Sequence, residues 1–222
     1  MEPELLFDVI LHGGTLLATF IIFRKEILKT LKSPRACLLI IVGSLPAAII
    51  GFTLLEVVEK SFNSMKVAGV GFLITGTWLW FTRYVPPKSI LLEGFLFSDI
   101  TFKKAFLIGL AQGIALLPGI SRSGTTIATA LFLRTGRRDA ATFSFLLSIP
   151  AICGAIGLKL TQLPSWPANE IPLFATGFIL SCLCGLGALA FLIKLIRRGN
   201  FYKFSYYCWL VGIAALVIAY LL

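Results

Sequence analysis

The sequence predicts an all-α polytopic membrane protein with six transmembrane helices, one re-entrant helix-loop-helix and an inverted-repeat architecture. The 222 residues are 58% hydrophobic and 14% charged, and their mean hydropathy is +0.93. This composition is far too apolar for a soluble domain of this size. Apolar runs of about 20 residues, the length that a helix needs to cross a bilayer, recur along the whole chain. One interrupted apolar segment and a weak internal repeat complete the pattern.

Six apolar runs are long enough to be spanning helices. They lie at residues 5–23, 36–55, 65–82, 141–160, 172–193 and 204–222. We expect each to be a helix, because lipid offers no hydrogen-bond partner to open backbone groups. The chain is therefore predicted to form a single integral membrane domain over residues 1–222.

The distribution of basic residues predicts the orientation of this domain. The formal net charge of +10 could suggest a nucleic-acid partner, but sixteen of the twenty Lys and Arg residues fall in alternate loops. This is the positive-inside pattern of a membrane protein, so no nucleic acid is expected. With these loops inside, both termini face outward. In a bacterium this places the chain in the plasma (inner) membrane with both termini in the periplasm.

Residues 105–133 form the interrupted apolar segment. They are too few for two spans, and one lipid-facing helix is ruled out by the interruptions at Pro118, Gly119, Arg122 and Gly124. Because the charges place the loops on both sides of the segment inside, we expect it to enter from inside, turn at depth and return. Non-helical backbone at that depth requires a cavity or surrounding protein.

Three spans precede this segment and three follow it, which suggests a duplicated unit. Residues match at offsets of 134 to 136 positions: Phe7 and Leu11 with Phe143 and Leu147, Gly43 and Gly51 with Gly177 and Gly185, and Gly76 with Gly212. Because three spans is an odd number, the units, about 5–82 and 105–222, are expected to be inverted. The partner of the PGISRSG stretch would lie about 12 to 18 residues before Met1, so the first re-entrant half is expected to be missing.

The stretch PGISRSGTT, residues 118–126, has the composition of a phosphate site. Arg122 is the only basic residue outside the loops, and a buried Arg in a bilayer costs about 3 kcal/mol or more unless it has a functional partner. Its planar fork suits phosphate oxygens, and the next helix directs its free N–H groups back at the loop. The predicted substrate-binding residues are Gly119, Ser121, Arg122, Ser123, Thr126 and Gln112. Arg122 and Ser121 are also the predicted catalytic residues.

Two alternatives stay open for this stretch. Pro and Gly could simply kink a helix, with Arg122 paired to a carboxylate, although a kink does not explain the flanking hydroxyl groups. Gln112 could hydrogen-bond a ligand or only a neighbouring helix. His12, the only His, is expected to be a hydrogen-bonded packing residue rather than a catalytic one.

The run QGIALLPGISRSGTT, followed by AATFSFLLSIP at 140–150, closely resembles the undecaprenyl-diphosphate phosphatase (bacitracin-resistance, BacA-type) family. FDVILHGGTLLA at 7–18 is similar to a further segment of that family, so the resemblance covers essentially the whole chain. It implies removal of the terminal phosphate from a C55 isoprenoid diphosphate, which recycles the lipid carrier of cell-wall synthesis. The implied partners are this lipid substrate and membrane lipids, and a homo-oligomer is left open.

The resemblance also implies a divalent cation, Mg²⁺ or Ca²⁺. Family members carry, before FDV, an acidic E/Q-x-x-x-E motif and a Ser-rich stretch ending in His, and neither is present in the 222 residues. We therefore predict no metal ligands in this chain and expect it to bind the diphosphate but hydrolyse it poorly. A transporter or flippase for an anionic lipid or solute is the alternative, because inverted repeats with broken helices are also transporter architecture. A wrongly assigned start codon would modify either interpretation.

Overall fold

The computed structural model describes residues 3–86, 96–160 and 171–221. All the regular structure within these ranges is helical. The helices are α1 (Pro3–Leu31), α2 (Pro34–Thr53), α3 (Leu55–Phe62), α4 (Met65–Phe81), η1 (Thr82–Tyr84), α5 (Phe102–Ile114), α6 (Arg122–Phe132), α7 (Arg137–Leu160), α8 (Ile171–Arg197), η3 (Phe201–Lys203) and α9 (Phe204–Leu221). The predicted all-α class is confirmed for these residues.

Five helical segments of the described chain are long and apolar enough to cross a membrane. They are Leu6–Leu31, Pro34–Thr53, Arg137–Leu158, Ile171–Arg197 and Phe201–Leu221. The sixth predicted span corresponds to α4, whose 17 residues extend about 25 Å at a rise of about 1.5 Å per residue. The hydrocarbon core is about 30 Å thick. Five of the predicted spans therefore coincide with helices of spanning length and composition, and the span at α4 stays a prediction.

The first helix is longer than the apolar run from which it was predicted. That run ends at residue 23, whereas α1 continues to Leu31 through a kink at Phe23, where φ is −98° and ψ is 15°. The added turns carry Arg, Lys, Glu and Leu, which are good helix formers in water. Several basic residues assigned to the first inner loop thus lie on a helical extension of α1.

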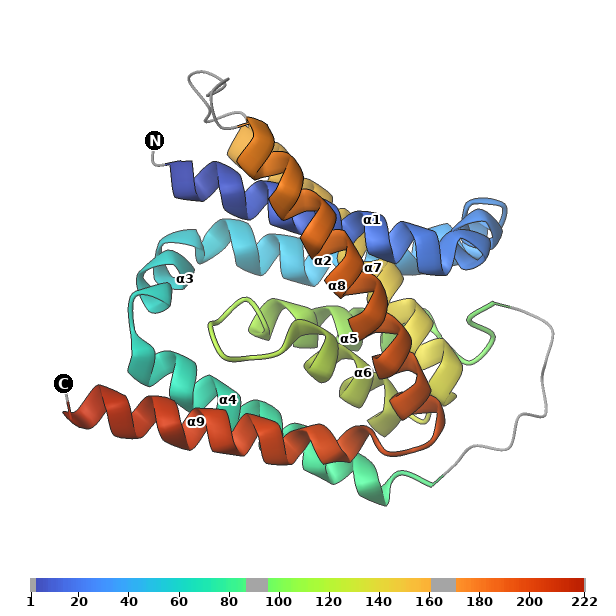
Figure 1. The fold of residues 1–222 in the computed structure, drawn as a ribbon. Coiled ribbons are helices and arrows are strands. Elements are labelled where there is room, and N and C mark those ends of the chain that lie inside the picture. Colours follow the sequence, from blue (N-terminus) through green and yellow to red (C-terminus); the bar gives the residue numbers. More distant parts are fainter. Residues whose placement is uncertain (1–2, 87–95, 161–170, 222) are drawn as a thin grey trace.

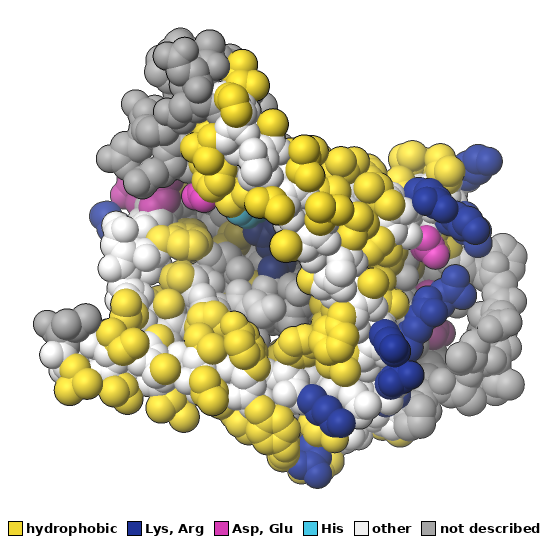
Figure 2. Space-filling view, viewed as in Figure 1, with side chains coloured by type: hydrophobic (Ala, Val, Ile, Leu, Met, Phe, Trp, Pro, Cys, Tyr) yellow, Lys and Arg dark blue, Asp and Glu magenta, His cyan; other side chains and the backbone are white. Residues whose placement is uncertain are grey.

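Two long helix pairs and α2 pack around the short α5–α6 pair. α1 packs along α8, α2 along α5 and α4 along α9. In Figure 1, α5 and α6 lie in the middle, with α1, α2, α7 and α8 on one side and α4 with α9 on the other. Both termini and the α5–α6 turn point to one end of the molecule, and the α1–α2, α6–α7 and α8–α9 connections lie at the opposite end. We call this opposite end the basic end, because Figure 2 shows Lys and Arg side chains gathered there.

Glycines matched by the repeat lie where helices approach closely. A Cβ added at Gly43 would lie 2.8 Å from Leu147 and 3.4 Å from Phe143, and one added at Gly177 would lie 2.7 Å from Phe7 and 3.4 Å from Leu11. Each glycine thus contacts the Phe and Leu of the other unit, and these Phe and Leu residues match each other in the sequence repeat. α2 meets α7 through the same residue types with which α8 meets α1.

The α4–α9 pair has the same reciprocity. A Cβ at Gly76 would meet the Trp209 ring at 2.5 Å and Ser205 O at 3.1 Å, three and seven positions before Gly212. A Cβ at Gly212 would meet Leu73 at 3.0 Å and Gly69 O at 2.9 Å, three and seven positions before Gly76. The two helices therefore present equivalent faces to each other.

The outer helix surfaces are apolar, as Figure 2 shows. Leu180 and Leu183 of α8 are 56% and 59% exposed, and Leu210 and Ile213 of α9 are 69% and 56% exposed. Soluble monomers rarely expose contiguous apolar patches larger than a few hundred Å². These surfaces suit lipid.

Candidate anion site at the α5–α6 turn

The site is built on a pair of helices that are too short to span a bilayer. α5 has 13 residues and α6 has 11, which correspond to about 20 and 16 Å. α5 packs along α2, and α6 contacts α4, α5 and α7. The entry to α5 is fixed by Arg35 of α2, whose guanidinium donates to Phe97 O at 3.1 Å and to Ile100 O at 2.8 Å.

The turn between α5 and α6 is held against α4. Gly119 has a φ of +81°, which favours a residue without a Cβ, and a Cβ there would collide with Ala68 O on α4. Thr75 of α4 ties down both sides of the turn. Its hydroxyl donates to Gly119 O at 3.1 Å and accepts from Ser121 N at 3.0 Å. The turn therefore has a fixed position relative to α4.

The first turn of α6 leaves two backbone donors free. Ser121 is the N-cap, and its hydroxyl accepts from Gly124 N at 3.1 Å, while Ser121 O accepts from Thr125 N at 2.8 Å. The N–H groups of Arg122 and Ser123 have no hydrogen-bond partner within the described chain. Together with the positive end of the helix dipole, such groups form an anion-binding site.

Arg122 lies at the first position of α6 and is half-buried. Its guanidinium has no ion pair or hydrogen bond to any residue that the structure describes. The alternative of an Arg paired to a carboxylate for packing therefore has no support in these ranges. An unpartnered guanidinium with five donors in an apolar bundle points to an anionic ligand.

The other predicted ligands differ in what they offer. The Thr126 hydroxyl donates to Arg122 O at 2.9 Å and is 1% exposed, so its proton is directed along the helix rather than into the turn. Gln112 on α5 is also 1% exposed, and both polar atoms of its amide lack a partner among the described residues. No helix neighbour in those ranges satisfies Gln112. Its role toward a ligand stays a prediction.

An apolar groove of about 290 Å³ adjoins the turn. It is lined by Lys66, Val67, Val70, Gly71, Ile74, Leu117, Pro118 and Ile120. The groove thus runs between α4 and the residues that lead into the turn. In Figure 2, the face of the molecule is hollowed between α8 and the α4–α9 pair.

Comparison with known proteins extends this geometry. The family described as bacitracin resistance protein BacA matches residues 1–214. The chain belongs to the BacA family. An undecaprenyl-diphosphatase of Desulfatibacillum aliphaticivorans is 40% identical over 97% of this chain and 85% of the relative. The undecaprenyl-diphosphatase of Carboxydothermus hydrogenoformans is 43% identical over 98% of this chain and 84% of the relative. The undecaprenyl-diphosphatase of Korarchaeum cryptofilum is 39% identical over 95% of this chain and 83% of the relative.

Membership of the BacA family confirms the resemblance seen in the sequence. It does not identify metal ligands in this chain. In the described part of the chain, no three His, Cys, Asp or Glu residues are grouped so that they could hold a metal ion. The ring of His12 is exposed, and its Nδ1 donates to Asp8 O at 2.8 Å, within α1. These residues do not fit a divalent cation, so no chemical step below passes through one.

Two residues that support the α5–α6 turn were not predicted from the sequence. Thr75 is the polar side chain among the buried positions of the apolar α4, and Gly71 of the same helix lies against Pro118 O. A polar residue and a small residue spaced four apart in a spanning helix are a signal of close packing. Only the structure shows that the partner of this face is the turn.

Thr75→Val is expected to destabilise the α5–α6 turn. Thr75 is 1% exposed, and Val removes the partner of a backbone C=O and a backbone N–H at once, at about 1–3 kcal/mol for each group left unsatisfied. Thermal unfolding of the purified variant in detergent checks this, with Thr75→Ser, which keeps the hydroxyl, as the control. An unchanged midpoint for the Val variant would contradict the bridging role.

Proposed function

We propose that this chain is an undecaprenyl-diphosphatase, which removes the terminal phosphate of a C55 isoprenoid diphosphate and returns the monophosphate carrier to cell-wall synthesis. The observation that carries the proposal is the unpartnered guanidinium of Arg122 at the start of α6, beside two free backbone N–H groups. Relatives that carry this activity in their names match nearly the whole chain. The established family and the chemistry of the turn point in the same direction.

Each part of the turn has a role in this proposal. Arg122 binds two oxygens of the terminal phosphate bidentately, and the N–H groups of Arg122 and Ser123 bind the same phosphate at the helix N-terminus. The Ser121 hydroxyl accepts from Gly124 N and keeps its own proton to donate to a phosphate oxygen. These donors stabilise the negative charge that develops as the P–O bond breaks. The apolar groove beside Pro118 suits the isoprenoid chain.

We also infer the arrangement of the chain in the membrane. Gly43 and Gly177 make matching contacts with Phe-Leu pairs on α7 and α1, and Gly76 and Gly212 make matching contacts across the α4–α9 pair. These contacts support two inverted units at about 5–82 and 105–222. The short α5–α6 pair then re-enters from the basic end. The positive-inside rule places that end in the cytoplasm and both termini in the periplasm, in the inner membrane.

Phosphate release separates a phosphatase from the transporter alternative. The 222-residue chain is reconstituted in liposomes with undecaprenyl diphosphate, and inorganic phosphate and the lipid products are measured in the presence of Mg²⁺ and Ca²⁺. The proposal predicts phosphate and undecaprenyl monophosphate in equal amounts, at the low rate expected from the sequence of this chain. Movement of intact diphosphate between leaflets without phosphate release would favour the transporter.

A further inference from the structure

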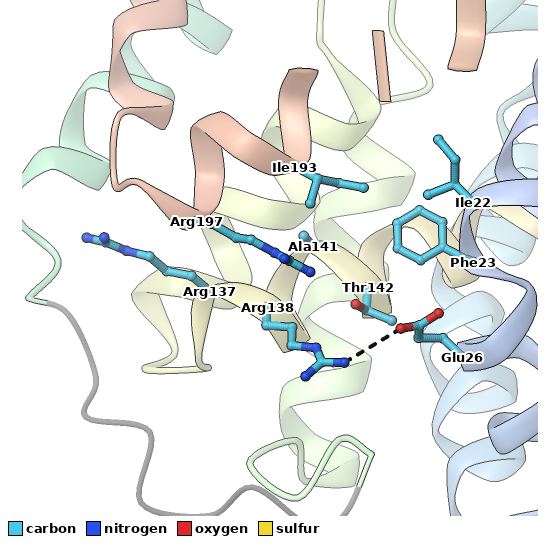
Figure 3. Close-up of a pocket in the computed structure, with 9 residues that line it drawn as sticks. All are labelled: Ile22, Phe23, Glu26, Arg137, Arg138, Ala141, Thr142, Ile193 and Arg197. Atoms are coloured by element: carbon cyan, nitrogen blue, oxygen red, sulfur yellow. Dashed lines mark ion pairs between the residues drawn. The ribbon is translucent and has the colours of Figure 1, made fainter. Parts of the chain in front are cut away.

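A second group of arginines surrounds a cavity at the basic end, away from the α5–α6 turn. The cavity measures about 80 Å³ and lies between α1, α7 and α8. Its lining consists of Ile22, Phe23, Glu26, Arg137, Arg138, Ala141, Thr142, Ile193 and Arg197 (Figure 3). A single water needs roughly 10–15 Å³, so the space suits one small polar group rather than a nucleotide or a sugar.

The charges that line this cavity do not balance. Three arginines and one carboxylate, Glu26, line the cavity, and Glu26 lies 3.7 Å from the Arg138 guanidinium. The Arg137 guanidinium lies against Gly199 and points away from the cavity, which leaves Arg138 and Arg197 beside it (Figure 3). In Figure 3 the guanidinium of Arg197 is directed from α8 toward the space beside Thr142, and Arg138 approaches from the other side. An anion between Arg138 and Arg197 would neutralise the excess charge.

Two of these arginines also lie at an unfavourable place on their helix. Arg137 and Arg138 are the first two residues of α7, where the positive end of the helix dipole repels cations. Asp139 in the same turn offsets part of this repulsion, and a bound anion would offset more of it and interact favourably with the same dipole. The helix terminus and the guanidinium groups therefore favour the same kind of ligand.

A buried donor is directed into the same space. Thr142 is 5% exposed, and its hydroxyl has no hydrogen-bond partner among the residues that the structure describes. Figure 3 shows its oxygen between the ends of Arg138 and Arg197. Because Thr142 lines the cavity, its hydroxyl is available as a donor to a ligand there. A phosphate oxygen would accept its proton.

The remaining walls of the cavity are apolar. Ile22, Phe23 and Ile193 form them, and other apolar side chains of the same helices are exposed on the outside of the bundle, such as Ile21 (40%) and Phe191 (57%). A ligand with a phosphate next to hydrocarbon matches this combination better than a freely soluble anion. Basic pockets between transmembrane helices on the cytoplasmic side bind the head groups of anionic lipids.

We propose that the cavity between α1, α7 and α8 binds the phosphate of an anionic phospholipid, held by Arg138, Arg197 and the Thr142 hydroxyl. The acyl chains lie along the outer surfaces of α1 and α8. This site is separate from the Arg122 turn and does not depend on the proposed phosphatase activity. It gives these arginines a specific ligand beyond their contribution to the positive-inside pattern.

The chain offers a matched pair of variants for the test. Arg197 lines the cavity, whereas its neighbour Arg198 does not, and both side chains are exposed at the same end. Arg197→Gln and Arg198→Gln remove the same charge from the same loop. Binding of phosphatidylglycerol to the full chain, in nanodiscs of phosphatidylglycerol and phosphatidylcholine, is measured by native mass spectrometry. One basic residue near a membrane contributes about fivefold to anionic-lipid binding, and we expect Arg197→Gln to weaken retention of phosphatidylglycerol by at least this factor.

Arg198→Gln is expected to retain the lipid as the wild type does. Thr142→Val, which keeps the shape of the side chain and removes the donor, is expected to weaken retention without lowering the thermal unfolding midpoint in phosphatidylcholine alone. Equal losses for Arg197→Gln and Arg198→Gln would overturn the proposal, because they would show a general surface-charge effect. Displacement of phosphatidylglycerol by millimolar inorganic phosphate would overturn the assignment to a lipid.

Discussion

Arg122→Lys is expected to lower kcat/KM for an isoprenoid diphosphate by about 100-fold or more, the loss typical of removing one donor to the developing charge. Lys keeps the positive charge but replaces a planar fork with a single ammonium group. Because the Arg122 guanidinium has no hydrogen bond or ion pair in the described ranges, the substitution breaks none there. The unfolding midpoint should therefore stay near that of the wild type. Phosphate release at several substrate concentrations, together with thermal unfolding, gives both values.

Arg134→Lys is the control for this variant. Arg134 follows α6 at the opposite end of the same helix, and its side chain is exposed. Its substitution should leave kcat/KM within about twofold, because surface changes of this kind have small effects. Near-normal turnover by Arg122→Lys would show that a point charge suffices and that bidentate binding is wrong.

Gly119→Ala is expected to have the largest effect on stability. The Ala must adopt a φ of +81°, which costs about 1–2 kcal/mol for an L-residue, and its Cβ would collide with Ala68 O. Overpacking of this kind adds about 1–3 kcal/mol. The turn must then move away from α4, so the Thr75 bridge and the anion site are disturbed together. The thermal unfolding midpoint and the rate of phosphate release should both fall.

Two other glycines provide matched controls. Gly154 of α7 and Gly187 of α8 have no atom within 4 Å of an added Cβ, and both lie inside helices. Ala at either position should leave stability unchanged or raise it by up to about 1 kcal/mol through helix propensity. If Gly119→Ala behaved like these two variants, the turn would not be held against α4 as described.

The sequence predicted the parts of the fold that depend on hydrophobicity and charge. The apolar runs located five helices of spanning length, because only structures that satisfy their own backbone hydrogen bonds can cross lipid. The basic loops on both sides of residues 105–133 required that segment to enter and leave the membrane on the same side. Pro118 and Gly119 then located the turn. The proposed anion site rests on one unusual residue, Arg122, because a guanidinium among apolar runs is costly unless it faces an anion or a water-filled cavity.

The remaining features depend on contacts that no local pattern encodes. Thr75 precedes Ser121 by 46 residues, so its bridge depends on how α4 packs. The extension of α1 beyond Phe23 follows from residues that favour a helix, which an apolar run does not reveal. The cavity beside Arg197 lies between three helices that are distant in sequence. A count of basic residues per loop does not distinguish the arginines that line it from their neighbours.

Whether a diphosphate binds at the start of α6 can be decided by an experimental structure with a non-hydrolysable isoprenoid methylene-diphosphonate. We expect density for the terminal phosphonate within hydrogen-bond distance of the Arg122 guanidinium and of the backbone N–H groups of Arg122 and Ser123. The apolar chain should lie in the groove beside Pro118. Density for the diphosphonate elsewhere, with Arg122 in contact only with protein, would contradict this binding mode.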